Sequence, residues 1–353
     1  MRLAEMMALR QVIGAGALVT VTERCPLSCA HCASAATLAG RQLDATALLR
    51  FLSTFTAKCR PEVLMLTGGE PLTRPRLVVE AARLVRSAGT RTAVLSGAFF
   101  AQGKGIPPSI REVARAVDHF SLSLDVFHER EVARENVFGA LHDLLRSGVA
   151  TSLHVVGTGP DDPYLAEVSE EVVARFGAAV PMLVSELRPI GRAAAWARRP
   201  ALPDPTLVAP CAMAAWPVIT TDGRVTACCN QAVVDGRTRP DHLSLGRIDT
   251  ATWPAVLERA KNLPMLRMVR TVGPLHIASR TAEPPDDYCT TCHRLSDSPA
   301  ATQWVAKADG PAGELLEAAA IRRGLAGGPA ALLRRHGSGR YSHLVGSAEA
   351  ADE

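Results

Sequence analysis

The sequence predicts an α/β fold built on a parallel sheet over its first 190 residues. Six apolar, β-branched runs in this region lack polar alternation, which is typical of strands buried on both faces. Helical patterns separate the runs, and repeated strand–helix alternation produces parallel βαβ units. Eight units would close a full barrel, so six predict either an open, partial barrel or a doubly wound sheet. The six runs are Ala17–Val21, Val63–Leu66, Thr92–Leu95, Phe120–Leu124, Leu153–Val156 and Val180–Leu187.

Local signals mark several of the intervening helices. Asp44 is the expected N-cap of the first of them. The pair Asp162-Pro163 is typical of an N-cap followed by proline in the first turn. Another helix is expected around Leu141 and should end near Gly148, because glycine often follows the last helical residue.

The strand–helix alternation stops near residue 200. Residues 198–210 contain four prolines and predict a linker, and residues 211–300 hold five of the nine cysteines without further alternation. In the last part, a helix is expected over Glu314–Leu325 and a frayed tail from Gly337 onward. The expected organisation is a barrel over 1–200, a cysteine-rich domain over 201–300, and a helix and tail over 301–353.

Composition limits the classes of protein to consider. Hydrophobic residues make up 47% of the 353 residues and charged residues 21%, which excludes a disordered chain. The net charge of +4 is too small to predict nucleic-acid binding. No apolar run approaches the ~20 residues of a membrane span, and no signal-peptide cleavage site follows the first apolar stretch. We therefore expect a cytoplasmic protein, in whose reducing environment clustered cysteines indicate metal binding more than disulfides.

Three cysteines follow the first predicted strand closely enough to bind one metal centre. They are Cys25, Cys29 and Cys32. A structural zinc site prefers four ligands, and His31 is poorly placed to be the fourth because it lies between two of the cysteines. A 4Fe–4S cluster accepts three cysteines and keeps one iron open for a small molecule. This segment therefore has three alternative interpretations: an iron–sulfur cluster, a zinc site, or a set of redox thiols.

The spacing Cys25-x3-Cys29-x2-Cys32 resembles the signature of radical S-adenosylmethionine (radical SAM) enzymes. The resemblance implies that the open iron binds the amine and carboxylate of S-adenosylmethionine, and that an electron from the cluster yields a 5′-deoxyadenosyl radical. His31 holds a position that is usually aromatic in the family and packs near the adenine. The resemblance also implies a partial (β/α)6 TIM barrel.

The segment Thr67-Gly68-Gly69-Glu70-Pro71 follows the second predicted strand. Paired glycines let the backbone approach a neighbour closely, and Glu70 is an acceptor for an ammonium group. The segment resembles the Gly-Gly-Glu segment of the family, which implies that it binds the methionine amine of the cofactor. Both motifs fall at carboxyl ends of strands, where barrel sites are built.

Two weaker features fit the same resemblance. Ser121, Ser123 and Asp125 share one face at the end of the fourth strand, and we favour Ser123 as the cofactor contact, with a solvated strand end as the alternative. The sixth strand closes with a segment that resembles a proline–glycine–arginine segment found in part of the family. Its candidate cofactor-binding residues are Arg188, Pro189 and Arg192, and the alternative is that the arginines are ordinary surface residues.

A second set of cysteines predicts a closed site with four thiolates. Cys211 is followed by a turn around Gly223, by Cys228, and after 60 residues by Cys289-Thr-Thr-Cys292. Zinc and an iron–sulfur cluster both suit four thiolates. The order of these residues resembles the SPASM/twitch extension of radical SAM enzymes. It implies the shorter twitch form, an α+β domain with one auxiliary 4Fe–4S cluster, and hence two clusters in the whole chain.

Cys228 and Cys229 are adjacent, so the spacing alone leaves two candidates for one ligand. Cys228 is favoured because its distance from Gly223 matches the resemblance. Cys229 is then either a buried bystander or a thiol that donates a hydrogen atom to a substrate radical.

The expected function follows from the resemblance. An oxidised product requires a further electron to leave the substrate after hydrogen abstraction, and a fully ligated auxiliary cluster is suited to accept it. We therefore favour an oxidoreductase that makes a crosslink or dehydrogenation in a ribosomally made peptide (RiPP maturation), with flavodoxin or ferredoxin as electron donor. The alternatives are a dehydrogenase or epimerase of a small aminocyclitol or sugar in antibiotic biosynthesis, and a non-enzymatic binding protein stapled by zinc.

Overall fold

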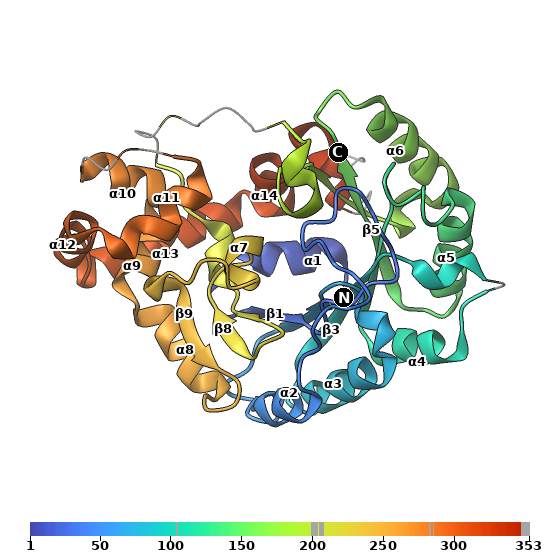
Figure 1. Cartoon of the computed structure of the whole chain (residues 1–353), viewed down its shortest axis with the longest axis horizontal. Helices are drawn as coiled ribbons and strands as arrows, with labels where there is room; N and C mark the ends of the chain where they lie inside the picture. Colours follow the sequence, from blue (N-terminus) through green and yellow to red (C-terminus); the bar gives the residue numbers. More distant parts are fainter. Residues whose placement is uncertain (104, 199–203, 205–207, 282–283, 285, 347–353) are drawn as a thin grey trace.

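The strands predicted from the sequence form one open sheet (Figure 1). The structure is a computed structural model that describes residues 1–103, 105–198, 204, 208–281, 284 and 286–346. Among these residues the sheet has nine strands, in the order β6-β5-β4-β3-β2-β1-β7-β8-β9. The six strands foreseen are β1 (Gly16–Thr20), β2 (Val63–Thr67), β3 (Arg91–Ser96), β4 (His119–Ser123), β5 (Ala150–Gly157) and β6 (Met182–Glu186).

The strand order decides between the two expected architectures. Each of the strands β1 to β6 pairs in parallel with the next one in the chain. A doubly wound sheet would reverse this order at a switch point. The uninterrupted order is that of a partial barrel, and β6 and β9 form its two ends, so the sheet does not close.

The barrel helices begin where the capping residues predict. Asp44 Oδ1 accepts a hydrogen bond from Ala47 N at 2.7 Å, and Asp162 Oδ1 accepts one from Tyr164 N at 3.0 Å. Gly148, with φ +82°, follows the last helical turn of α5, as expected. Figure 1 shows these helices along the outside of the sheet. They are α2 (Ala45–Leu52), α3 (Pro75–Ser87), α4 (Pro108–Ala116), α5 (Arg134–Arg146) and α6 (Pro163–Phe176).

The cysteine-rich region continues the same sheet. Its hairpin strand β7 (Val218–Ile219) pairs in parallel with β1, and β8 (Arg224–Thr226) and β9 (Ser244–Arg247) follow in antiparallel pairs. Gly223, with φ +80°, makes the predicted turn. The expected linker over 198–210 lies largely outside the described residues. The remaining helices gather beyond β9 and around α1 in Figure 1: α1 (Leu3–Ala8), α7 (Gln231–Val234), α8 (Trp253–Asn262), α9 (Pro264–Thr271), α10 (Pro274–Arg280), α11 (Tyr288–Arg294), α12 (Pro299–Ala308), α13 (Pro311–Ala326) and α14 (Gly328–His336).

The end of the chain differs in part from its prediction. The helix expected over Glu314–Leu325 is confirmed as α13. The frayed tail from Gly337 is wrong as far as residue 346, because Ser338 N donates to Val184 O of β6 at 2.9 Å. Tyr341 and Val345 then bury their side chains against the body of the protein, so apolar burial holds this segment. Residues 347–353 lie outside the described residues.

None of the helices in the described part of the chain combines the length and apolar character needed to cross a membrane.

The packing of Gly16 of β1 against Trp216 of the cysteine-rich region leads to a stability prediction. A Cβ atom on Gly16 would lie 2.2 Å from the buried indole of Trp216. Gly16→Ala must therefore displace Trp216, and we expect it to lower the free energy of unfolding by about 1–3 kcal/mol, measured by urea denaturation of the metal-free protein. Gly139 of α5 has open space around its Cβ position, so Gly139→Ala should stabilise by about 0.5–1 kcal/mol. Equal stability of both variants would contradict this packing.

Candidate iron–sulfur and S-adenosylmethionine site

The first three cysteines lie on the loop that follows β1. Cys29 is buried, and Cys25 and Cys32 are half-buried. Leu27 N donates to Cys25 Sγ at 3.4 Å, and Cys32 N donates to Cys29 O at 3.2 Å. Burial, together with the nearby negative charges of Glu70, Cys32 and Cys29, raises the pKa of Cys25 to about 11. Thiolates at this position therefore require a compensating positive centre.

The glycine turn after β2 packs directly on the chain that leads to Cys25. Gly69 N donates to Thr22 O at 2.6 Å, and Glu70 N donates to Arg24 O at 2.8 Å. A Cβ atom on Gly68 would lie 2.3 Å from Thr22 O, and one on Gly69 would lie 2.4 Å from Arg24 O. The close neighbour that requires these glycines in the structure is thus the cysteine loop itself.

Glu70 is buried behind this turn. Its Oε1 accepts from Leu72 N at 2.9 Å, and its Oε2 accepts from Ser96 Oγ at 3.0 Å and Gly97 N at 2.8 Å. Burial raises the pKa of Glu70 to about 7, although the three hydrogen bonds favour the charged form. Pro71 follows and begins a short 3-10 helix over Pro71–Thr73. Glu70 therefore links the end of β2 to the end of β3 at the edge of the sheet that carries the cysteines.

His31 contacts the end of β4 across the same edge. Its Nε2 lies 3.3 Å from Asp125 Oδ2, and its ring stacks on Phe127 with centroids 4.7 Å apart. His128 Nδ1 lies 2.8 Å from the same Asp125 oxygen. Burial lowers the pKa of His31 to about 4, which leaves its imidazole neutral at pH 7. In His128, burial opposes the charge, but hydrogen bonds to Asp125 and Cys29 raise the pKa to about 10.

At this strand end Asp125 is the residue that reaches His31, and the expected contact of Ser123 with the cofactor stays a prediction. Ser123 is half-buried beside His154 in the sheet register, and Ser121 accepts a hydrogen bond from Ser152 instead. His128 was missed, although its position three residues after an aspartate that ends a strand is a signal for a carboxylate–imidazole pair.

The segment after β6 reaches both cysteine sets. Arg192 Nε donates to Cys29 O at 2.9 Å, and Arg192 N donates to Cys32 O at 3.0 Å, so this arginine fastens the cysteine loop. Arg188 lies close enough to Cys289 for its charge to favour that thiolate. Pro189 lies between them, where Ile190 N donates to Arg188 O at 2.8 Å. The expected contacts of these residues with the cofactor stay a prediction.

The second cysteine set comes together from three distant segments. Cys211 precedes a 3-10 helix (Ala212–Ala215), Cys228 follows β8, and Cys289 and Cys292 lie on α11. Burial raises the pKa of all four thiols, and Cys228 responds to the charges of Cys229, Cys292 and Cys211. The four predicted ligands are therefore neighbours in the fold.

Cys228 and Cys229 have different surroundings. Asn230 N donates to Cys228 Sγ at 3.3 Å, which repeats the contact that Leu27 N makes with Cys25 Sγ. Cys229 Sγ instead accepts from Arg10 Nη2 at 3.7 Å. The backbone amide at Cys228 favours a thiolate there.

The spread of the sulfur atoms bears on the choice between zinc and an iron–sulfur cluster. Four thiolates on one zinc ion at about 2.3 Å lie less than about 4 Å apart. Among the described residues, however, no group of three or more cysteine sulfurs falls within 4.8 Å of one another; His31, Asp125 and His128 are the one such group of potential ligands. The wider spacing fits a cluster, in which each thiolate binds a different iron.

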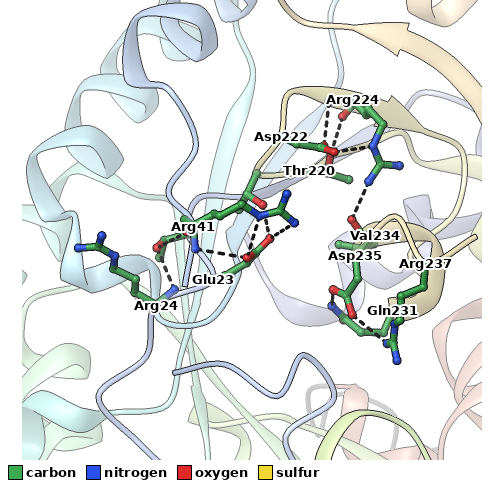
Figure 2. Close-up of polar contacts among 12 residues, drawn as sticks. Glu23, Arg24, Arg41, Thr220, Asp222, Arg224, Gln231, Val234, Asp235 and Arg237 are labelled. Carbon is green, nitrogen blue, oxygen red and sulfur yellow. Dashed lines mark hydrogen bonds and ion pairs between the residues drawn. The ribbon is translucent and has the colours of Figure 1, made fainter. Parts of the chain in front are cut away.

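A polar network joins the two cysteine-bearing segments (Figure 2). Glu23, two residues before Cys25, pairs with Arg41 at 3.0 Å and accepts a hydrogen bond from Thr221 in the hairpin turn. Beside Thr221, Asp222 pairs with Arg224 at 2.8 Å. The guanidinium of Arg224 also donates to Val233 O and Val234 O of α7, which begins just after Cys229 and Asn230.

Comparisons with known proteins agree with this geometry. The family described as "Radical SAM superfamily" matches residues 19–172. The AdoMet-dependent heme synthase of Methanosarcina barkeri is 35% identical over 109 residues, which are 30% of this chain and 29% of that protein. SuiB of Streptococcus suis, solved with precursor peptide SuiA, has a TM-score of 0.52 at 11% identity over 82% of this chain and 78% of SuiB. SuiB bound to S-adenosylmethionine gives 0.51 at 10% identity, over 82% and 80%.

These findings support a radical SAM domain with the partial TIM-barrel fold in this part of the chain. The likeness to SuiB is one of fold. The chain spans under a third of the length of the heme synthase that it matches.

Proposed function

We propose that this chain is a radical SAM enzyme that oxidatively modifies a ribosomally made peptide. The observation that carries the proposal is the convergence of the Cys25–Cys32 loop, the Gly68–Glu70 turn and Asp125 at one edge of a partial barrel. Radical SAM domains bind one 4Fe–4S cluster and S-adenosylmethionine, and when bound this pair supplies a 5′-deoxyadenosyl radical that abstracts hydrogen.

In this proposal, some residues at this edge of the barrel bind the cluster or the cofactor, and others hold the binding residues in place. Cys25, Cys29 and Cys32 hold the cluster in our proposal, and Arg192 keeps their loop in place through the carbonyl groups of Cys29 and Cys32. Glu70 is the acceptor for the cofactor amine, and its charge is favoured at neutral pH and above, because its pKa is about 7.

The aromatic residues beside the loop extend away from it toward the surface. The ring of neutral His31 stacks on Phe127. The ring centroids of Phe127 and Trp196 are 5.5 Å apart, and Trp196 is 48% exposed. We assign His31 to the adenine. Phe127 and Trp196 then form a side wall that excludes water from the reacting atoms, and the outer end of this wall is where a substrate meets the protein.

The four cysteines of the second set hold an auxiliary 4Fe–4S cluster in this proposal. Their buried thiols need a positive centre to ionise, and their spacing fits a cluster better than zinc. Four cysteine ligands leave no iron free for substrate, so an electron-transfer role suits this site and an oxidative outcome suits the reaction.

A peptide substrate is supported by the fold shared with SuiB, which was solved with a precursor peptide. The alternative substrate is a small aminocyclitol or sugar, and a substrate assay distinguishes it from a peptide.

The proposal predicts cofactor cleavage and a specific product. Anaerobically reconstituted protein given a reductant and S-adenosylmethionine should form 5′-deoxyadenosine, measured by chromatography. A short peptide encoded beside the gene should lose the mass of a pair of hydrogen atoms for each modification. Cys29→Ala should reduce cleavage to the level without protein, because a cluster ligand is lost.

Cys59→Ala is the matched control, since Cys59 is half-buried outside both cysteine sets. Absence of 5′-deoxyadenosine from iron-loaded protein would refute the enzyme class. Consumption of an aminocyclitol or sugar with no change in the peptide would refute the substrate class alone.

The two adjacent cysteines give a further prediction. Cys228→Ala should lower the iron content by about half, because one of two 4Fe–4S clusters loses a ligand. Cys229→Ala should keep the wild-type iron content, because Cys229 contacts Arg10 and, within the described part of the chain, accepts no backbone amide of the kind seen at Cys228. Iron and sulfide analysis of both variants measures this, and the reverse pattern would show that Cys229 is the ligand.

A further inference from the structure

Arg10 brings a buried positive charge to the second cysteine set. It lies on a 3-10 helix (Leu9–Gln11) before the first strand, and its side chain is 7% exposed. Its Nη2 donates to Cys229 Sγ at 3.7 Å and to Met213 O at 3.4 Å. Its guanidinium carbon lies 4.8 Å from the centre of the Trp216 ring. These contacts place the charge between the segments that carry Cys211 and Cys228.

The charge of Arg10 has no carboxylate partner in the described part of the chain, and its buried Nη1 has no hydrogen-bond partner there. The other buried arginines of the described residues have carboxylate partners. Arg267 pairs with Asp309, and Arg270 pairs with Glu317 at 2.6 Å. A buried, unpaired guanidinium is strongly destabilising. The surroundings of Arg10 therefore call for a negative group that the carboxylates of the described residues do not supply.

The thiolates of the second set are the negative groups within reach. Met213, whose carbonyl group accepts from Arg10, lies two residues after Cys211, and Cys229 directly follows Cys228. The segment that bears Arg10 is also held in place, because Trp216 Nε1 donates to Leu9 O at 3.0 Å and Gly14 N donates to Ala215 O at 2.9 Å. The arginine is thus fixed beside Cys229 and beside the segment that follows Cys211.

We propose that Arg10 is a positioning residue that stabilises the reduced, more negative form of the auxiliary cluster and so raises its reduction potential. This inference rests on the proposed function, since it requires a cluster on Cys211, Cys228, Cys289 and Cys292. Adding an electron to a buried cluster increases its negative charge, and a nearby cation without a counter-charge lowers the free energy of that state.

The test uses the full chain with Cys25, Cys29 and Cys32 replaced by alanine, so that only the second centre is titrated. Potentiometric titration followed by electron paramagnetic resonance measures the ratio of reduced to oxidised cluster. Arg10→Gln should lower that ratio about tenfold at a fixed applied potential, which is a shift of about 59 mV for a one-electron couple. Arg10→Lys should keep the ratio near the wild-type value, because it keeps the charge.

Arg83→Gln is the control, because it removes an equal charge from the exposed face of α3, where Arg83 pairs with Glu112. It should leave the potential unchanged. If Arg10→Gln loses iron that Arg10→Lys retains, the charge is required to hold the cluster and not to set its potential, and the inference is overturned. If both variants keep the wild-type potential, or both lose their iron, the inference is overturned while the proposed function stands. If the parent chain binds no second cluster, the proposed auxiliary site itself is refuted.

Discussion

The close packing of two backbones is the constraint on which the candidate site depends. The glycine turn after β2 donates its amides to the carbonyl groups of Thr22 and Arg24, immediately before Cys25. Side chains at Gly68 or Gly69 would collide with those carbonyl groups. The cysteine loop is therefore positioned by the strand next to β1, and Arg192 fastens its other side from the end of β6. Residues far apart in the sequence thus meet because the sheet brings the carboxyl ends of its strands together.

The same sheet also fixes where the second cysteine set stands. Because β7 pairs with β1, the hairpin before Cys228 extends the barrel sheet, and Glu23 and Thr221 join that hairpin to the first cysteine loop. The segment around Arg10 contacts the same region from the N-terminal side, because Trp216 Nε1 donates to Leu9 O. A shared framework of this kind gives the two proposed clusters a constant separation and orientation, which is what electron transfer between buried centres needs.

Much of the fold follows from local sequence signals, whereas the charge partners do not. Continuous apolar runs predicted β1 to β6, and Asp44 and Asp162 predicted two helix starts, since both signals act over a few residues. Cysteine spacing identified the first candidate centre for the same reason, whereas the second was identified by the resemblance of its cysteine order to the twitch extension. The contact of Arg10 with Cys229 joins residues 219 positions apart and leaves no local pattern. The position of the residues from Gly337 at the end of the sequence suggested fraying, but Tyr341 and Val345 are buried there by tertiary packing.

The central claim is that Cys25, Cys29 and Cys32 bind a cluster with one iron open to S-adenosylmethionine. Mössbauer spectroscopy of protein loaded with isotopically enriched iron tests it most directly. We predict that adding S-adenosylmethionine changes the signal of one iron site, and that this change is absent from a chain with the three cysteines replaced by alanine. A spectrum that S-adenosylmethionine leaves unchanged, or protein that binds no iron at these cysteines, would contradict the account.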